Sequence, residues 1–169
     1  MKSHFLIFGL LVLIQFVTQI SFARMAGGYG DQYPLGPNPQ TTPGVLCNRP
    51  DGFRYAEKIK YCNRNVDPEL KREIIVTYDR QFGFTIERMD RRKFKIDHFI
   101  PLCVGGGNDR ENLWPQHESI YKVTDPLEAL ICEKMAQGRL RQEIAVQMIR
   151  AAKSDLKLVP EVTRRVRAL

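Results

Sequence analysis

The sequence contains little histidine, and this shortage limits the sites that it can build. Only His4, His98 and His117 occur among its 169 residues, which excludes a centre with several imidazoles, such as a three-histidine zinc site. The chain also lacks a Cys-x-x-Cys pair, which argues against a structural zinc knuckle. It contains no internal repeats, and its length as a prior allows one ordinary domain, which excludes a large multidomain machine.

The residues that are present favour a folded domain with an anionic partner. Hydrophobic residues make up 43% of the chain and charged residues 27%, a composition that can form a core and differs from that of a disordered chain. Lys and Arg number 26 against 19 Asp and Glu, which gives a formal net charge of +7. Such a basic excess favours nucleic acid or an acidic membrane surface as a partner.

The first 23 residues have the pattern of a secretory signal peptide. Lys2 precedes an apolar stretch over residues 5–14, and Ser21 and Ala23 are the small residues that a signal peptidase reads. We therefore expect cleavage after Ala23 and a secreted or periplasmic protein that is free of the membrane. The alternative is an uncleaved membrane anchor, but the apolar run is short of the roughly 20 residues that a spanning helix needs.

Export changes what the cysteines indicate. An even number of cysteines in an exported chain predicts disulfides, here two. Three pairings are open, and the sequence does not choose among them. The four cysteines are Cys47, Cys62, Cys103 and Cys132.

The rest of the chain divides into three segments by composition. Residues 24–44 are rich in Gly and Pro and predict a flexible leader. Residues 45–153 have the hydrophobic periodicity of a folded domain. Residues 154–169 are predicted to form a basic C-terminal tail with three arginines.

The periodicity within the domain predicts both strands and helices, and so an α+β fold. Asp67 as a cap and Gly83 after the last turn define one helix. Asp125 as a cap and Gly138 beyond the end define a second. The expected elements are strands over 54–63, 93–102 and 112–116, and helices over 68–82, 126–137 and 141–153, the last with Ile144 and Met148 buried.

The segment 96–117, IDHFIPLCVGGGNDRENLWPQH, gathers the residues that carry chemistry. Both histidines that remain after signal cleavage lie in it. Adjacent residues of a strand point to opposite faces, so Asp97 and His98 can serve one site only if the chain bends, which Pro101 and the glycines allow. Strand, glycine loop, strand and helix would form a small ββα hook.

These residues resemble the HNH endonucleases, also called ββα-metal or His-Me finger nucleases. The likeness lies in Asp97-His98, in Pro101-Leu102 followed by Gly105-Gly106, and in Asn112-Leu113. The longer pattern D-H-x-I-P-L-x-x-G-G-x-N-D-x-x-N-L-W-P-Q is similar to that of a group of small exported bacterial HNH proteins. The resemblance covers roughly residues 45–153 and implies an HNH hook with additional helices, stabilised by disulfides.

The resemblance also implies roles for single residues. Asp97 would be a metal ligand, His98 the general base, and Asn112 a residue that orients the base or ligates the metal. The chemistry of these side chains agrees with the roles. An imidazole with an unperturbed pKa near 6.5 takes up a proton at neutral pH, and a carboxylate suits a hard divalent ion.

The likeness departs from the family at the third letter of its name. Many members have a histidine or asparagine at the position held here by Tyr121, which is a poor ligand. His117 is the natural substitute, with Glu118 as the runner-up. Mg²⁺ or Mn²⁺ fits such a ligand set better than a closed Zn²⁺ site.

A basic cluster leads directly into this segment and is expected to contact phosphates. It consists of Arg88, Arg91, Arg92 and Lys93. We therefore expect an exported, metal-dependent endonuclease that acts on DNA, or on RNA, with little sequence specificity, because no recognisable module for reading bases accompanies the site. The alternative is a catalytically silent basic domain that binds nucleic acid or the cell envelope on the same scaffold. A weaker alternative is an exported toxin that needs an inhibitor.

Overall fold

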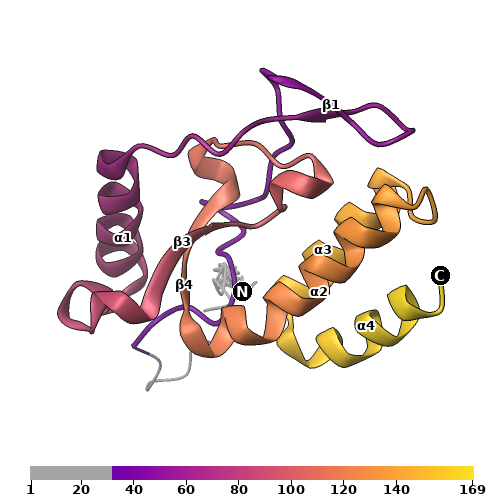
Figure 1. The fold of residues 1–169 in the computed structure, drawn as a ribbon. Coiled ribbons are helices and arrows are strands. Elements are labelled where there is room, and N and C mark those ends of the chain that lie inside the picture. Colours follow the sequence, from indigo (N-terminus) through magenta and orange to yellow (C-terminus); the bar gives the residue numbers. More distant parts are fainter. Residues whose placement is uncertain (1–31) are drawn as a thin grey trace, which may run out of the picture.

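The computed structural model describes residues 32–169, so the predicted signal peptide and the start of the leader lie outside the described residues. The described part is an α+β domain, as the sequence predicts. Figure 1 shows the two strands β3 and β4 between α1 on one side and α2, α3 and α4 on the other. The elements are β1 (Gly52–Arg54), β2 (Ile59–Tyr61), α1 (Pro68–Phe82), β3 (Phe94–His98), β4 (Leu113–His117), α2 (Glu118–Ala136), α3 (Gln142–Ser154) and α4 (Val159–Arg167).

The strands form two antiparallel pairs, β1 with β2 and β3 with β4. In the second pair, Phe94 lies opposite His117 and His98 lies opposite Leu113. A glycine-containing loop joins β3 to β4, and α2 follows directly. The predicted order of strand, glycine loop, strand and helix is therefore present.

Two apolar clusters hold the helices against the strands. One cluster lies between α1 and the β3–β4 pair, and its buried members include Ile74, Tyr78 and Ile96. The other lies among α2, α3 and α4, and its members include Ile131 and Ile149. The β3–β4 pair therefore has a helix on each face, which explains why all five residues of β4 are buried.

Helix α1 has the predicted bounds. The Asp67 side chain accepts a hydrogen bond from the backbone N–H of Glu69 at 2.6 Å, which caps the first turn. Gly83 adopts a left-handed conformation with φ 77° and donates its N–H to Asp79, as glycine does after a helix end.

Two predicted elements are wrong in detail. The strand expected over 54–63 is the β1–β2 hairpin, which turns where Tyr55 and Lys58 have positive φ. The second helix begins at Glu118 and not after Asp125, so Pro126 lies inside it. Tertiary burial of α2 against β4 overrides the local capping signal of Asp125.

Smaller predictions about single side chains also need correction. Pro115 does not end the second strand, because it pairs with Ile96 within β4. The last predicted helix is α3, which buries Met148 as expected. Ile144 is 41% exposed and does not belong to the core.

The predicted tail and leader are both part of the packed domain where the structure describes them. The tail contains α4, whose Val162 and Val166 are buried in the cluster with α2 and α3. In the leader, the Thr42 hydroxyl is buried, lies 2.9 Å from the Tyr78 hydroxyl and donates to the carbonyl of Leu113. The composition of the leader predicts flexibility, but the hydrogen bonds of Thr42 hold this part of it against the domain, and the valines of α4 do the same for the tail.

The four cysteines form two disulfides, as predicted, and the structure selects one of the three pairings. Cys47 pairs with Cys62, and Cys103 pairs with Cys132. No cysteine within residues 32–169 is free. These bonds indicate an oxidising environment such as the extracellular space. None of the helices in this range is long and apolar enough to cross a membrane.

We expect Val166→Ala to lower the free energy of unfolding by about 1–2 kcal/mol, because a fully buried side chain loses two methyl groups. Urea unfolding followed by circular dichroism measures this, with the exposed Arg167→Ala as the control on the same helix. Equal midpoints for both variants and the wild type would mean that residues 159–167 do not pack on the domain.

Candidate functional site

Asp97 and His98 are adjacent at the end of β3, and their side chains enter different environments. Strand pairing continues through His98, so the bend that would bring both side chains to one side is absent, and they point to opposite faces. Asp97 faces Lys153 of α3. His98 faces Arg64 and Asn108.

The His98 imidazole has a partner at each nitrogen. Its Nε2 lies 3.0 Å from Oδ1 of Asn108, and its Nδ1 lies 3.4 Å from Nη1 of Arg64. The Asn108 amide donates to the carbonyl of Asn63, and Nη2 of Arg64 donates to the carbonyl of Ile96. These donors and acceptors fit a neutral ring that carries its proton on Nε2 and presents the Nδ1 lone pair toward Arg64.

The electrostatic surroundings keep this ring neutral. Burial lowers the pKa of His98, and the positive charge of Arg64 lowers it further, while the hydrogen bond to Asn108 acts in the opposite direction. His98 is only 2% exposed. His98 is therefore a neutral base at pH 7, covered by the exposed side chain of Arg64.

Asp97 belongs to a network of acids and lysines on the other face of β3. Oxygen atoms of Asp97, Asp125 and Glu128 lie within 4.8 Å of one another. Nζ of Lys95 lies 2.8 Å from Asp125 and 3.5 Å from Asp97. Nζ of Lys153 lies 2.6 Å from Oε1 of Glu128, an ion pair without hydrogen-bond geometry, and 3.5 Å from Asp97.

Burial and the two lysines act in opposite directions on these acids. Burial alone would raise the pKa of Asp97, but the positive charges of Lys153 and Lys95 lower it below its usual value. For Glu128 burial prevails: it raises the pKa to about 7 against the attraction of Lys153, and the nearby charge of Asp97 raises it further. Glu128 is thus only partly ionised at neutral pH.

Asn112 is a structural residue of the loop after His98. Its Oδ1 accepts from the N–H of Ile100, and its Nδ2 donates to the carbonyls of Ile100 and Gly107, all at 2.9 Å. The loop is so tight that a Cβ on Gly106 would lie 1.8 Å from the Ile100 carbonyl oxygen. The amide is buried and engaged by backbone. It holds the loop that follows His98, and both of its polar atoms are already bonded to backbone.

His117 lies at the far end of the strand pair from His98. It pairs with Phe94, four residues before His98, which separates the two histidines by roughly 13 Å along the sheet. Its Nδ1 accepts from the N–H of Ser119 at 3.2 Å and caps α2, and its ring stacks on Tyr33 at 4.0 Å. The structure therefore does not bring His117 together with Asp97 and His98, as the predicted role of third ligand would require.

Glu118, the runner-up for the third ligand, and Tyr121, at the family's usual position, also contact other residues. Glu118 forms an ion pair with Lys122 at 2.7 Å. The ring of Tyr121 lies under Nζ of Lys95 at 4.7 Å. Neither side chain contributes to the group of acids around Asp97.

The divalent metal that the resemblance implies does not fit the residues expected to hold it. Asp97, Asn112 and His117 are not brought together, because one faces α3, one clamps the loop and one caps α2. The oxygen atoms of Asp97, Asp125 and Glu128 are of the type that Mg²⁺ and Mn²⁺ prefer. However, two lysine ammonium groups already neutralise these carboxylates.

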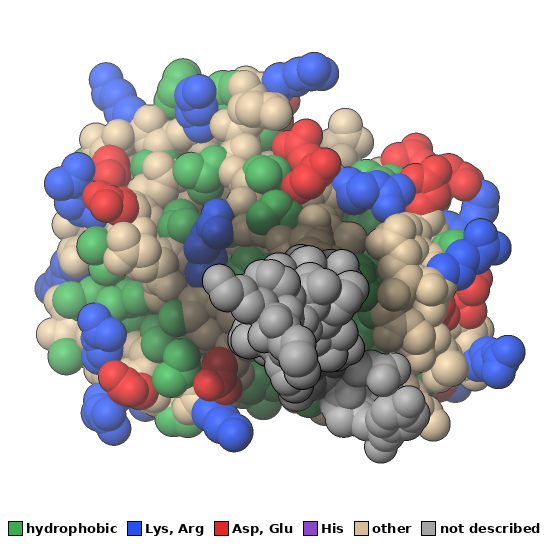
Figure 2. Space-filling model, turned by 180° about the vertical axis from the view of Figure 1, so that it is seen from behind, with side chains coloured by type: hydrophobic (Ala, Val, Ile, Leu, Met, Phe, Trp, Pro, Cys, Tyr) green, Lys and Arg blue, Asp and Glu red, His purple; other side chains and the backbone are tan. Residues whose placement is uncertain are grey.

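The predicted basic cluster lies at the other end of β3 from His98. Arg92 pairs with Asp90 at 3.0 Å, and Lys93 lies 3.8 Å from Glu118. Arg91 donates to the carbonyl of Phe94, and Arg88 has no ion pair within residues 32–169. On the face seen in Figure 2, Lys and Arg side chains are spread around the rim with acidic side chains among them. The cluster is exposed, but it is not adjacent to the base.

The structure gives a place in the site to two residues that had no role assigned from the sequence, although Asn108 belongs to the longer pattern. Arg64 contacts Nδ1 of His98, and Asn108 contacts Nε2. Arg64 is two residues from Cys62, whose disulfide to Cys47 anchors this stretch beside the end of β3. A lone arginine in a polar loop has no periodic pattern, so only the position of the disulfide could have drawn attention to it.

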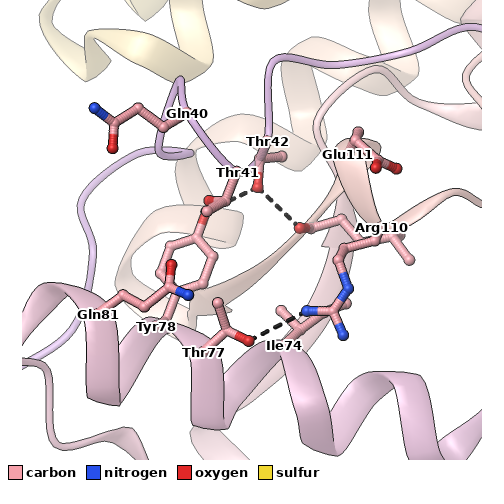
Figure 3. Close-up of a pocket in the computed structure, with 10 residues that line it drawn as sticks. Gln40, Thr41, Thr42, Ile74, Thr77, Tyr78, Gln81, Arg110 and Glu111 are labelled. Atoms are coloured by element: carbon pink, nitrogen blue, oxygen red, sulfur yellow. Dashed lines mark hydrogen bonds between the residues drawn. The ribbon is translucent and has the colours of Figure 1, made fainter.

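A pocket beside α1 is separate from this site. It has a volume of about 250 Å³, lies beside α1 and is lined by Thr42, Tyr78 and Arg110 among others. Figure 3 shows Arg110 reaching across to Thr77, a bond of 3.2 Å. Neither Asp97 nor His98 lines the pocket, so its residues do not take part in the chemistry considered for β3.

Comparisons with known proteins identify no relative of this chain. No protein-family model matches the chain, and neither a curated protein nor a solved structure is significantly similar to it.

We expect the contribution of Glu128 to the free energy of unfolding to decrease as the pH rises. Because its pKa rises from 4.5 to about 7 in the fold, the native state holds the proton more tightly than the unfolded state. Its contribution to the free energy of unfolding, at most about 3 kcal/mol, is full below pH 4.5 and disappears as the pH rises through 7. The surrounding charges are Asp97 and Lys95 of β3, Asp125 of α2 and Lys153 of α3.

Urea unfolding between pH 4.5 and 8 tests this by comparing the free energy of unfolding of wild type with that of Glu128→Gln. Both proteins contain the two histidines, whose lowered pKa values act with the opposite sign, so subtracting one free energy from the other removes the histidine contribution. Glu133→Gln, at an exposed position of the same helix, is the control. A difference between wild type and Glu128→Gln that stays constant with pH would show that Glu128 is ionised normally.

Proposed function

We propose that this protein is an exported nuclease that hydrolyses phosphodiester bonds of DNA or RNA on an HNH-like hook. The observation that carries the proposal is the neutral His98 beside Arg64 at the end of β3. The order of strand, loop, strand and helix supports it. So does the amide of Asn112, which clamps the loop directly after the base.

In the proposed reaction His98 acts as the base. Nη1 of Arg64 moves from Nδ1 to a phosphate oxygen, and the exposed Nδ1 accepts a proton from the attacking water. Asn108 holds the Nε2 proton and so keeps the ring in the required tautomer. The water oxygen bonds to phosphorus, and Arg64 stabilises the charge that develops on the phosphoryl group. The bond to the leaving oxygen breaks, the leaving oxygen keeps the electron pair and takes a proton from solvent, and the His98 imidazolium releases its proton to solvent.

The basic cluster at the start of β3 would hold the polyanion at a distance from the base. Its ion pairs, such as that of Arg92 with Asp90, are exposed. Exposed pairs contribute little energy, so their cations can exchange a carboxylate for a phosphate at small cost. A nucleic acid that contacts both Arg92 and Arg64 would run along the strand pair.

A second candidate function is a catalytically silent domain that binds nucleic acid or the cell envelope. Two observations favour it: His98 is almost fully buried, and the metal ligands that the HNH resemblance implies lie apart. This candidate shares the basic surface with the nuclease but needs no movement of Arg64.

We expect His98→Ala to reduce cleavage of supercoiled plasmid and of RNA by about 10²–10⁴-fold, because it removes the base. His117→Ala is the matched control, since it removes the other histidine of the exported chain from the far end of the strands. It should retain cleavage within a few fold where it remains folded. Each assay is run in Mg²⁺, in Mn²⁺ and in EDTA, and the account predicts that cleavage persists in EDTA.

The same samples distinguish the two candidates. If the oxidised wild type cleaves neither substrate in any metal, while His98→Ala binds DNA as tightly as wild type, the silent binding domain is correct. Equal loss of cleavage in both histidine variants, with both folded, would remove the special role of His98.

A further inference from the structure

We infer that the ammonium group of Lys153 occupies the place of a divalent ion at the end of β3, so that the acidic group Asp97, Asp125 and Glu128 takes no metal while Lys153 is present. The inference concerns the network behind Asp97 and does not depend on nuclease activity.

The contacts of Lys153 are those of a cation held by oxygen ligands. Its Nζ donates to the carbonyl of His98 at 2.6 Å and to Oδ2 of Asp97 at 3.5 Å. It forms an ion pair with Oε1 of Glu128 at 2.6 Å. An ammonium group has three donors, and here it meets three oxygen atoms, two from the strand end and one from α2.

Burial makes this cation a fixed part of the structure. Lys153 is only 1% exposed, and its neighbours Ala152 and Ile149 on α3 belong to the apolar cluster. A divalent ion between Asp97 and Glu128 would have to displace the ammonium group into this apolar surrounding. Burying an unpaired charge is strongly unfavourable, so the displacement opposes metal binding.

The charges of the network are already close to balance. Lys153 neutralises the acids from within, and Lys95, which is 33% exposed at its side chain, pairs with Asp97 and Asp125 from the solvent side. Three carboxylates therefore face two ammonium groups, and the raised pKa of Glu128 reduces the negative charge further. Little attraction remains for a third cation.

This arrangement also gives Lys153 a positioning role for the proposed base. The bond from Nζ to the carbonyl of His98 fixes the main chain that carries the imidazole. This positioning role rests on the proposed function, whereas the exclusion of a metal ion does not, and metal binding is measured without cleavage as the readout.

The test measures Mn²⁺ binding by electron paramagnetic resonance and thermal unfolding in EDTA or millimolar Mn²⁺. Wild type should show the same melting temperature in both and no bound Mn²⁺. Lys153→Met should melt lower than wild type in EDTA, bind Mn²⁺ at least about tenfold more tightly than wild type, and melt several degrees higher with Mn²⁺ than without it. Lys157→Met, at an exposed position, should behave as wild type.

Further variants keep the test decisive. Lys153→Gln removes the charge but retains a donor for the His98 carbonyl, and it replaces Lys153→Met if the latter does not fold. Asp97→Asn combined with either variant should abolish the new Mn²⁺ binding. The inference is overturned if wild type binds Mn²⁺ in a manner that Asp97→Asn abolishes, or if the folded Lys153 variants bind no more Mn²⁺ than wild type.

Discussion

The buried ammonium group of Lys153 links three elements of the fold at one point. It lies on α3, bonds to the backbone at the end of β3 and pairs with Glu128 of α2. A buried charge is tolerated only when it is paired, and removal of one partner from such a pair typically costs about 3–5 kcal/mol. This contact therefore acts together with the apolar cluster to fix the end of β3 against α2 and α3.

The strand that Lys153 fixes has two different faces, and this separates stability from chemistry. Asp97 points into the acid and lysine network, where its carboxylate forms ion pairs with Lys95 and Lys153. His98 points the other way, toward Arg64 and Asn108. The predicted site, with a metal ion on Asp97 beside His98 as the base, does not fit this geometry, because the two side chains lie on opposite faces of β3. A site that uses the histidine with an arginine is compatible with it, and it draws its positive charge from the chain itself.

The parts of the fold with local signals were predictable, and those with distant partners were not. Helix α1 has its cap and its terminal glycine in the sequence, so its bounds follow directly. The segment around Asp97 and His98 was located because two of the three histidines fall in it. Lys153 lies 55 residues from His98 in the chain, and no periodicity connects them. No local pattern indicates the position of Arg64, which depends on a disulfide. The buried valines of α4 are also difficult to predict, because arginines lie between them in the sequence.

The most direct test of the central claim is a heteronuclear NMR measurement of the Lys153 side chain. A buried ammonium group bonded to the His98 carbonyl should exchange its protons slowly and give a resolved nitrogen-proton signal, absent in Lys153→Gln. Addition of paramagnetic Mn²⁺ should leave this signal and the backbone amide of His98 unbroadened. Selective broadening of both signals at low Mn²⁺, reversed by EDTA, would show that a metal ion binds at the end of β3 and that Lys153 does not exclude it.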